Sequence, residues 1–559
     1  MTIYRFRVLN SAIAILLFFL VTAMAGAQIL PAMIYGDSMP ERATALVEGV
    51  DPGYCMAGWT KSYGVGTPGF SNILVIKTDP LGVPLWSRVS LGDKDDEAYS
   101  MVRTSDQCYT ITGWTKSYGI GIPNKNIFVL KLDASGNPVW GWVYGGELDD
   151  EAYSIIETID NGYAVTGFTH SFGPPPYPNI LVMKLGPQGM LQWAKVYWVF
   201  PDHNQDEGYA IIQTPDTGYA VVGRTKISGS TFFDPFVLKI DQLGNTQWVK
   251  IMLGEIDKDE GYSVALDLQS NILAAGFTRS WGTNPGNAAD MFVAQFGMNG
   301  VPFWSRTYGW TEGDEMVLDD RSLTATSDGG SAVCGPTTSR GPGIPNPNFL
   351  ILKLDPAGMP MWGRSHPSPY DPGLLSDVPL PMIQEQNGGY AIAGWTNSFP
   401  YLGGTDDFHL LTLDQNGDRP VCVEPQDPEM QETNWEPCEM VDTAFSVVID
   451  SLKLEPVEVS YHPICQESTA VHEKTRVLPK VQSLQMQVTG DRIELNLSHA
   501  AFVTVKLFAR DGRQVALLAS KQFDAGKHEL MLPADIASGV YLVRASANRV
   551  NVRAKVVRF

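Results

Sequence analysis

The chain has 559 residues and carries 61 acidic against 40 basic side chains, which gives a formal net charge of −21. This length accommodates several domains or one large repeat array, and six cysteines are too few for a disulfide-based scaffold. The negative charge argues against a nucleic-acid partner, whose phosphates would be repelled.

Residues 1–27 read as a secretory signal peptide. Arg5 and Arg7 give a basic start, an apolar run follows from about Val8 to Val21, and Ala25-Gly26-Ala27 provides small residues for cleavage before Gln28. An uncleaved anchor helix is the alternative. No later segment is apolar for long enough to cross a bilayer, so the sequence predicts a secreted or surface-attached chain with no transmembrane segment after cleavage.

About a dozen residues recur along the next part of the chain. The copies include PGYCMAGWTKSYG from Pro52, NGYAVTGFTHSFG from Asn161 and GGYAIAGWTNSFP from Gly388. They align on a glycine that returns every 53 to 59 residues, at Gly58, Gly113, Gly167, Gly223, Gly276, Gly335 and Gly394. A period of this length indicates a solenoid, a propeller or an array.

Each repeat contains four short β runs. In the third copy these are AYSIIET, GYAVTGFT, NILVMKL and LQWAKVYW, separated by turns such as IDNG and GPQG. No helical periodicity extends across the array. The sequence therefore predicts an all-β fold, a seven-bladed β-propeller of four-stranded antiparallel blades over residues 28–422. A linear β-solenoid fits less well, because its repeats are usually shorter and its strands parallel.

The two ends of the array complement each other. AMIYGDSMPERAT from Ala32 matches WVYGGELDDEAY from Trp142 and reads as a fourth strand without the first three. The seventh repeat has its third strand from Asp407, but Cys422 stands where the other repeats have tryptophan. Residues from about 30 to 37 are therefore expected to form the outer strand of blade seven, so that the N-terminal strand closes the ring.

Two aromatic positions recur once per repeat and are expected to pack between neighbouring blades rather than to bind a ligand. One follows the turn between the third and fourth strands, at Trp86, Trp140, Trp193, Trp248, Trp304 and Trp362. The other belongs to the GY pair, at Tyr54, Tyr163, Tyr219 and Tyr390.

One face of the ring collects the links between blades and the loops between second and third strands. The loops present aromatic residues that we take as candidates for ligand binding: Tyr63, Tyr118, Phe172, Trp281 and Phe399. The links hold acid pairs at Asp96-Glu97, Asp150-Glu151, Asp206-Glu207, Asp259-Glu260 and Asp314-Glu315. Aromatic rings stack on sugars and carboxylates accept from sugar hydroxyls, so a glycan is one expected ligand.

The repetition of the acid pairs favours a structural role over a ligand-binding one. They are expected to pair with Lys61, Lys116 or Arg279, or to bond a threonine and the backbone of a neighbouring blade.

Departures from the repeat are the better sign of a specific site. The link before blade four contains His203, the link before blade seven contains His366, and blade six carries TEGDEMVLDD. We include both histidines among the candidate ligand-binding residues. The alternative for each is a solvated loop side chain.

The sequence offers no catalytic motif, because a G-x-S-x-G elbow, a zinc motif and a phosphate loop are all missing. A glycosidase needs two carboxylates of separated pKa in one pocket, and nothing in the sequence selects such a pair. LDQNGD from Leu413 lacks the alternating acids and terminal glutamate of an EF-hand, so no cofactor is predicted and calcium is indicated by no motif. The expected function is a non-enzymatic binding or adhesion module for a glycan or a surface protein. An exported polysaccharide hydrolase or lyase and a purely structural surface protein are the alternatives.

Residues 423–478 change in character and are expected to form an acidic, cysteine-containing linker or cap. The stretch from Ala444 is expected to add a hairpin. Cys422, Cys438 and Cys465 cluster here, and one pair among them is expected to be bridged in an oxidising compartment, with the pairing left open. Cys55, Cys108 and Cys334 are expected to be small buried thiols on strands.

Residues 479–559 alternate apolar and polar residues in about seven strands, which predicts a small immunoglobulin-like β-sandwich. The segment resembles the C-terminal sorting domain of type IX secretion cargo in VKLFARDGRQV from Val505, AGKHELML from Ala525, SGVYLVRA from Ser538 and the closing KVVRF from Lys555. A related module of flagellar hook-assembly proteins shares the DGR…G pattern. The resemblance implies a Gram-negative host, the secretion machinery as a partner, passage across the outer membrane, and removal of the tail with surface attachment or release. The repeat array resembles bacterial exported β-propeller repeat proteins, without the signature residues of kelch or WD repeats.

Overall fold

The computed structural model divides the chain into two units, residues 1–467 and 468–559, which are described separately. The first unit is described for residues 33–36, 39–64, 69–90, 92–199, 205–226, 229–252, 254, 256–310, 313–339, 347–366, 377–397, 406–418 and four short strands between 439 and 463. The second is described for residues 484–489, 492–497, 501–509, 514–533, 539–547 and 550–558. Within these ranges all regular structure is β, and no helix is long and apolar enough to cross a membrane. The expected signal peptide lies outside the described residues.

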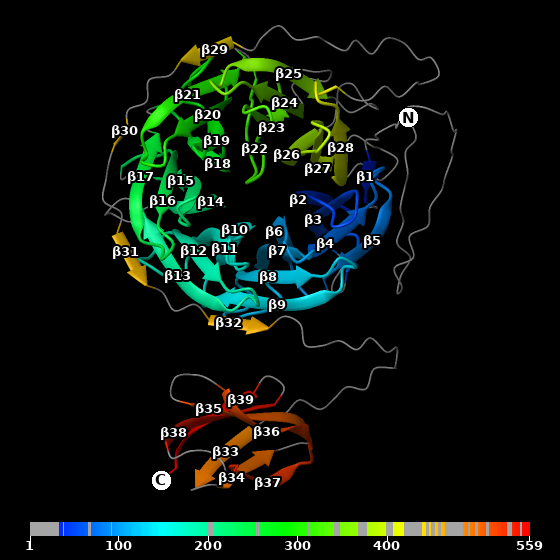
Figure 1. Cartoon of the computed structure of the whole chain (residues 1–559), viewed down its shortest axis with the longest axis vertical. Coiled ribbons are helices and arrows are strands. Elements are labelled where there is room, and N and C mark those ends of the chain that lie inside the picture. The colour runs from blue at the N-terminus through cyan, green and yellow to red at the C-terminus, as the bar shows by residue number, and fades with distance from the viewer. Residues whose placement is uncertain are drawn as a thin grey trace. The chain divides into compact units, whose positions relative to one another are not determined.

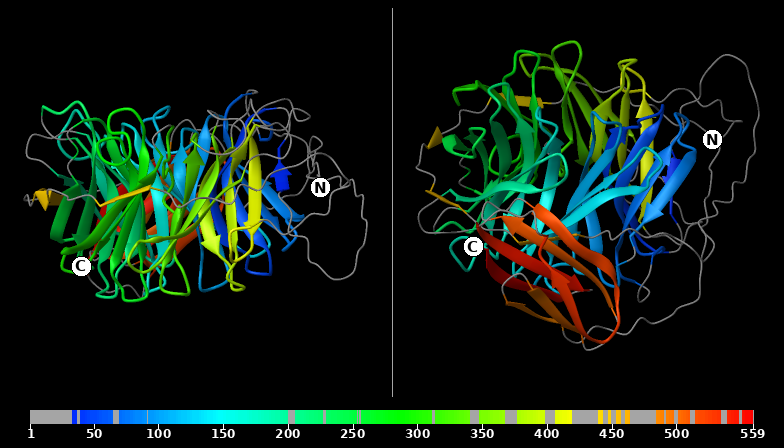
Figure 2. Two further views of the ribbon diagram at one scale, coloured as in Figure 1. Left: turned by 90° about the horizontal axis from the view of Figure 1, so that it is seen from above. Right: turned by 60° about the horizontal axis from the view of Figure 1, so that its bottom comes forward.

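Repeated four-stranded antiparallel sheets, the blades, build a propeller-like first unit, and Figure 1 shows them succeeding one another around a centre. Blade two consists of β6 (Asp96–Arg103), β7 (Tyr109–Thr115), β8 (Asn126–Leu132) and β9 (Pro138–Gly145), of which β6 is innermost. Figure 2 shows the strands running up and down between two faces, which carry the connecting loops.

The other blades repeat this order. Blade one has β2 (Glu41–Glu48), β3 (Tyr54–Thr60), β4 (Asn72–Thr78) and β5 (Pro84–Val89); blade three has β10 (Asp150–Glu157), β11 (Tyr163–Thr169), β12 (Asn179–Leu185) and β13 (Leu191–Trp198). Blade four has β14 (Asp206–Gln213), β15 (Tyr219–Thr225), β16 (Asp234–Ile240) and β17 (Thr246–Met252); blade five has β18 (Asp259–Leu266), β19 (Ile272–Thr278), β20 (Asp290–Phe296) and β21 (Pro302–Gly309). Blade six has β22 (Leu323–Ala325), β23 (Ser331–Thr337), β24 (Asn348–Leu354) and β25 (Pro360–His366); blade seven has β26 (Asp377–Gln384), β27 (Tyr390–Thr396), β28 (Asp407–Leu413) and β1 (Met33–Tyr35).

The N-terminal strand completes blade seven as the sequence predicts. Met33, Ile34 and Tyr35 of β1 pair with Leu410, His409 and Phe408 of β28, and the three β1 residues are buried. Strands distant in sequence thus share one sheet.

A bulge in the first strand explains the glycine on which the repeats align. In blade three, Ala152 pairs with Gly167 and Ser154 with Thr166, so Tyr153 is the extra residue. The bulge brings a carbonyl of the first strand against the glycine, and a Cβ added at Gly167 would lie 1.8 Å from the Glu151 oxygen. The corresponding distances are 1.7 to 2.1 Å at Gly58, Gly113, Gly223, Gly276, Gly335 and Gly394.

Contacts between neighbouring blades use the recurring aromatic positions, as predicted. Trp86 packs edge-on against Tyr109 of the next blade with ring centroids 6.2 Å apart, and the same contact joins Trp140 to Tyr163, Trp193 to Tyr219 and Trp362 to Tyr390. A second contact follows four residues after the tryptophan, where a tyrosine hydroxyl donates to a turn carbonyl of the next blade. It joins Tyr144 to Gly189 at 2.5 Å, Tyr197 to Gly244 at 2.8 Å and Tyr308 to Gly358 at 2.7 Å.

Two of the strand cysteines are placed as expected and the third is not. Cys55 in β3 and Cys334 in β23 are buried free thiols, whereas Cys108 lies half-buried in the turn before β7. Cys422, Cys438 and Cys465 lie outside the described residues.

The second unit has two sheets with one shared hydrophobic core. The strands are β33 (Leu484–Thr489), β34 (Arg492–Leu497), β35 (Ala501–Ala509), β36 (Gln514–Phe523), β37 (Gly526–Met531), β38 (Gly539–Ala547) and β39 (Val550–Arg558). They form the sheets β33-β34-β37 and β36-β35-β38-β39. Ile493 and Leu495 of one sheet cluster with Val505 and Val543 of the other, so the pattern of alternating residues is satisfied by packing the sheets face to face.

Candidate functional site

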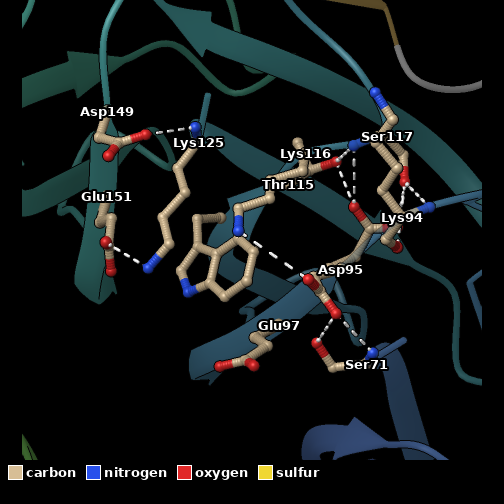
Figure 3. A network of polar contacts seen from close by, with 12 residues as sticks. Ser71, Lys94, Asp95, Glu97, Thr115, Lys116, Ser117, Lys125, Asp149 and Glu151 are labelled. Atoms are coloured by element: carbon tan, nitrogen blue, oxygen red, sulfur yellow. Dashed lines mark hydrogen bonds and ion pairs between the residues drawn. The ribbon is translucent and has the colours of Figure 1, made fainter. Parts of the chain in front are cut away.

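In blades two, three and five the first acid of the pair anchors the loop of its own blade. In blade two, Asp96 accepts from Thr115 at 2.5 Å and from the Ser117 hydroxyl at 2.9 Å, and Figure 3 shows Thr115 and Ser117 side by side in this loop. Asp150 with Thr169 and Ser171 repeats the arrangement. Burial raises the pKa of Asp96, and these hydrogen bonds oppose the shift. The acids thus fix the T-x-S loops, in agreement with the structural role that their repetition favours.

Of the three basic residues expected to pair with the acid pairs, Arg279 does so and Lys116 and Lys61 have other contacts. Lys116 lies 3.9 Å from Asp95, the residue before the acid pair, and the Lys61 ammonium lies 5.9 Å from the centre of the Trp59 ring. Arg279 pairs with Asp314 at 2.8 Å.

The register of blade six corrects the sequence alignment. Glu315 pairs with Thr337 as Asp96 pairs with Thr115, and its carboxylate accepts from the Thr337 hydroxyl at 2.8 Å. Glu315 therefore takes the place of the first acid, and Asp314 that of Asp95. The spacing of the sequence repeat did not predict this one-residue shift, because the residues after Glu315 do not continue as a regular first strand.

The loop aromatics chosen from the sequence are half-buried. Tyr63, Tyr118, Phe172 and Trp281 each pack against a hydrophobic cluster of a neighbouring pair of blades. Phe399 and His203 lie outside the described residues. A role of these side chains in ligand binding stays a prediction.

His366 is not in the irregular link, where the sequence places it. It ends strand β25, its side chain is buried, and its Nε2 lies 2.8 Å from the Gly417 carbonyl oxygen. This is the contact that tyrosine makes in blades two, three and five. The placement from sequence is wrong because the strand continues four residues past Trp362.

A set of residues on the innermost strands of four blades was passed over in the sequence analysis. We call it the Glu–Tyr arc: Glu97, Glu151, Glu207 and Glu260 with the bulged Tyr99, Tyr153, Tyr209 and Tyr262, on β6, β10, β14 and β18 (Figure 1). Each tyrosine donates to the glutamate two residues before it, at 3.1, 3.3, 2.6 and 2.6 Å in that order.

The tyrosines of the arc contact one another in succession. Ring centroids are 5.3 Å apart for Tyr99 and Tyr153, 5.0 Å for Tyr153 and Tyr209, and 4.7 Å for the parallel pair Tyr209 and Tyr262. The signal was present in the sequence as DEAY and DEGY, but the bulge that turns the tyrosine inward could not be read from it.

Three cations neutralise part of the arc: Arg224, Lys125, and Lys258, whose ammonium lies 3.5 Å from the Glu260 carboxylate. Arg224 donates to Glu207 at 2.9 and 3.0 Å and to Glu260 of the next blade at 3.0 Å. Lys125 bonds Glu151 at 2.6 Å and stands 4.1 Å from the Trp114 ring centre; Figure 3 shows Lys125 reaching toward Glu151. Every glutamate of the arc therefore has at least one polar partner.

The irregular stretch of blade six enters the centre of the ring. Between Met316 and Ser322 the chain leaves the innermost strand, and Asp320 accepts from Ser100 of blade two at 2.8 Å. Ser263 of blade five donates to the Asp320 carbonyl at 2.8 Å, and Arg321 donates to the Ile155 carbonyl at 3.3 Å. Burial and the neighbouring carboxylate raise the pKa of Asp319 well above its usual range. This segment ties several first strands together.

An aromatic cluster around Arg42 joins blades one and seven. The Arg42 guanidinium lies 4.3 Å from the Trp395 ring centre and 5.6 Å from that of Trp59, and it pairs with Asp406 at 2.6 Å. Both tryptophans are half-buried, as the loop aromatics are. We call this set the rim cluster. Its two indole faces, guanidinium and carboxylate are groups that suit a polyhydroxylated ligand.

Carboxylates also meet at the seams between blades. Asp234 and Asp290 begin third strands at positions where Asn72, Asn126 and Asn179 stand in the first three blades. Burial, with the charge of Asp259 nearby, raises the pKa of Asp234 to about 7. Burial likewise raises the pKa of Asp290 to about 6 and of Glu315 to about 7.

These pKa values predict that the chain is more stable at pH 5 than at pH 8. The folded chain holds protons that an unfolded carboxyl, with a pKa of about 4, has lost. The stabilisation is therefore complete below about pH 4 and disappears as the pH rises through 6 to 7. Urea unfolding should give a higher midpoint at pH 5, and Asp234→Asn should raise the midpoint at pH 8. Asn126→Asp, the reverse change in blade two, should lower it. Equal midpoints in all three chains at both pH values would contradict this account.

No metal site is evident in the described residues, where no three His, Cys, Asp or Glu side chains are grouped so that they could hold an ion.

Comparisons with known proteins identify no relative from which a function can be taken. No family model and no curated protein matches the chain. Among solved structures, a protein of unknown function from Bacteroides caccae is 12% identical, covering 55% of this chain and 91% of its own, with a TM-score of 0.28. The BSP domain of a biofilm associated protein is 9% identical over 96% and 99% of the two chains, with a TM-score of 0.11. At these scores neither likeness carries an argument.

Proposed function

We propose that this chain is an exported, surface-displayed binding module in which seven blades close into one β-propeller, with the rim cluster as the centre of a glycan-binding face. The first part concerns the ring. Its support is the β1–β28 pairing, the hydrogen bond of 2.6 Å from the Tyr35 hydroxyl to the Gly82 carbonyl of blade one, and the Arg42–Asp406 pair between blades one and seven. The first and third join the beginning of the array to its end, and the second joins the added strand of blade seven to blade one.

The rim cluster carries the functional proposal. Trp59 and Trp395 are half-buried and offer the rest of their rings for a sugar to stack on, while Arg42 and Asp406 supply a donor and an acceptor beside them. The arc supports binding rather than hydrolysis, because its glutamates are engaged by tyrosine hydroxyls, Lys125 and Arg224.

Export and display rest on the sequence patterns at the two ends. The proposal includes secretion through the signal peptide and a C-terminal immunoglobulin-like sorting domain of the type IX kind in a Gram-negative bacterium. The two-sheet packing of the second unit is compatible with that domain.

A glycan array probed with the mature chain, residues 28–559, tests the function. We expect saturable binding that is lost in Trp59→Ala and Trp395→Ala, because each removes a stacking surface. Phe303→Ala, which removes an exposed ring on the fourth strand of blade five, is the control and should bind normally. The array is read with and without calcium, and Tyr118→Ala and Trp281→Ala report on the loop aromatics.

The outcomes separate the alternatives. A flat array from folded protein would overturn glycan binding and leave adhesion to a surface protein or a purely structural role. Cleavage of an arrayed polysaccharide would favour the hydrolase or lyase. If Tyr118→Ala and Trp281→Ala lost binding while Trp59→Ala and Trp395→Ala kept it, the glycan site would lie at the loop aromatics and not at the rim cluster.

A further inference from the structure

Four short strands extend the outer edges of four blades. They are β29 (Glu439–Asp442), β30 (Val447–Val448), β31 (Lys453–Pro456) and β32 (Ser460–Pro463), together the belt. The belt pairs in turn with β21, β17, β13 and β9, and Figure 1 shows it on the outside of the ring. The sequence predicts a hairpin from Ala444, and this expectation is wrong, because β30, β31 and β32 each pair with a blade and not with one another.

The belt uses the same position on every blade. The residue four after the recurring tryptophan is Tyr308, Met252, Tyr197 or Tyr144, and its partners are Met440, Val447, Leu454 and Tyr461. These partners are all apolar or aromatic and follow at intervals of seven residues. One blade thus corresponds to seven residues of belt, and the pairing is made by backbone, as in strand addition.

Three outer edges carry no additional strand from the described residues: β5 of blade one, β1 of blade seven and β25 of blade six. Burial of the residue three positions after the recurring tryptophan differs between the edges that pair with the belt and those that do not. Val143, Val196 and Ile251 on belted edges are buried, whereas Val89 on β5 and Ser365 on β25 are half-buried.

Charge favours an acidic strand at these edges. The residue two after the tryptophan is basic in five blades, at Arg88, Lys195, Lys250, Arg306 and Arg364. On blade five, Arg306 stands opposite Asp442 in the ladder. Between residues 439 and 463 the sequence has five acidic residues and one lysine. Arg88 and Arg364 repeat the basic position on β5 and β25, where Arg88 also donates to the Ser135 carbonyl and Arg364 to Asp418 at 2.7 Å.

We propose that the edges β5, β1 and β25 dock an extended acidic strand of another polypeptide, with an apolar residue every seventh position. On the other four blades, the chain's own belt provides a strand of the same kind. Docking continues the interface that the belt makes on the adjoining blades, through the same backbone pairing. The three edges belong to adjoining blades, so one polypeptide can pair with all of them and bind more tightly than it would to any single edge.

A fluorescent peptide with the sequence of residues 439–463, mixed with the full chain, tests the proposal by anisotropy. We expect saturable binding that falls about tenfold in Arg88→Glu/Arg364→Glu, because the reversed charges repel the acidic strand. Lys258→Glu, a change of the same kind on the loop face, should leave binding unaltered. A peptide with one residue inserted between successive segments should bind about tenfold more weakly, because its apolar residues no longer match the blade spacing.

Three results would overturn the proposal: no saturable binding to folded chain, equal binding of the in-step and out-of-step peptides, or binding that ignores Arg88 and Arg364. If Arg306→Glu weakened binding while Arg88→Glu/Arg364→Glu did not, the peptide would be replacing the belt, and the open edges would not be its site.

Discussion

Gly167→Ala is expected to destabilise the first unit by about 3 kcal/mol or more. The added Cβ would lie 1.8 Å from the Glu151 carbonyl oxygen, and this atom belongs to the backbone of the bulged first strand. Relief requires the bulge to move, and with it Tyr153 and the contact between neighbouring tyrosines of the arc. Chemical denaturation of the full chain, followed by tryptophan fluorescence, measures the loss.

Gly186→Ala in the same blade is the matched control. Its added Cβ would meet only ordinary contacts, the nearest being the Gln192 Nε2 atom at 3.4 Å, so we expect a change within about 0.5 kcal/mol. If both variants unfolded at the same denaturant concentration, the bulge would not be the reason for the repeating glycine.

Arg224→Met is expected to cost roughly 3 kcal/mol, because it leaves Glu207 and Glu260 without their shared cation. The side chain of Glu260 is 2% exposed, so solvent cannot replace the guanidinium. Methionine retains much of the volume, and the loss therefore reports charge and hydrogen bonding. The unfolding midpoint at pH 7 is the measurement.

Two further chains isolate the cause. Lys116→Met removes a cation that lies 3.9 Å from Asp95 in a more exposed pair, and we expect an effect below about 1 kcal/mol. Arg224→Met with Glu207→Gln and Glu260→Gln should recover stability, because no unpaired carboxylate remains. A triple variant as unstable as Arg224→Met alone would show that the guanidinium acts through packing.

The fold was largely predictable because each repeat marks the ends of its own strands with turn residues. Alternating apolar residues, turn residues and the glycine of GxT recur together, so four strands per copy follow from one copy. The strand β1 was predictable because its sequence matches a fourth strand and the seventh repeat lacks one. The departure of blade six from the repeat was visible in its sequence. The register shift of Glu315 was not, because it depends on the path of residues 317–321 in the folded chain.

The site was predictable only in part. The structural role of Asp96 and Asp150 follows from repetition. The arc was missed because a bulge decides which face a residue joins, and a one-residue bulge leaves no mark in composition. The rim cluster was missed because Arg42, Trp395 and Asp406 are brought together by blades at opposite ends of the array. The belt was misread because its seven-residue interval reflects the spacing between blades, which the local sequence does not contain.

The measurement that tests the closed ring most directly is hydrogen exchange of the Met33–Tyr35 amides in the full chain. A ring joined through β1 predicts protection of these amides comparable to that of fourth strands inside the array, such as β13, with coordinated loss in Gly394→Ala, which disturbs blade seven. Exchange of Met33–Tyr35 at the rate of an unstructured chain, while β13 stays protected, would contradict closure by the N-terminal strand.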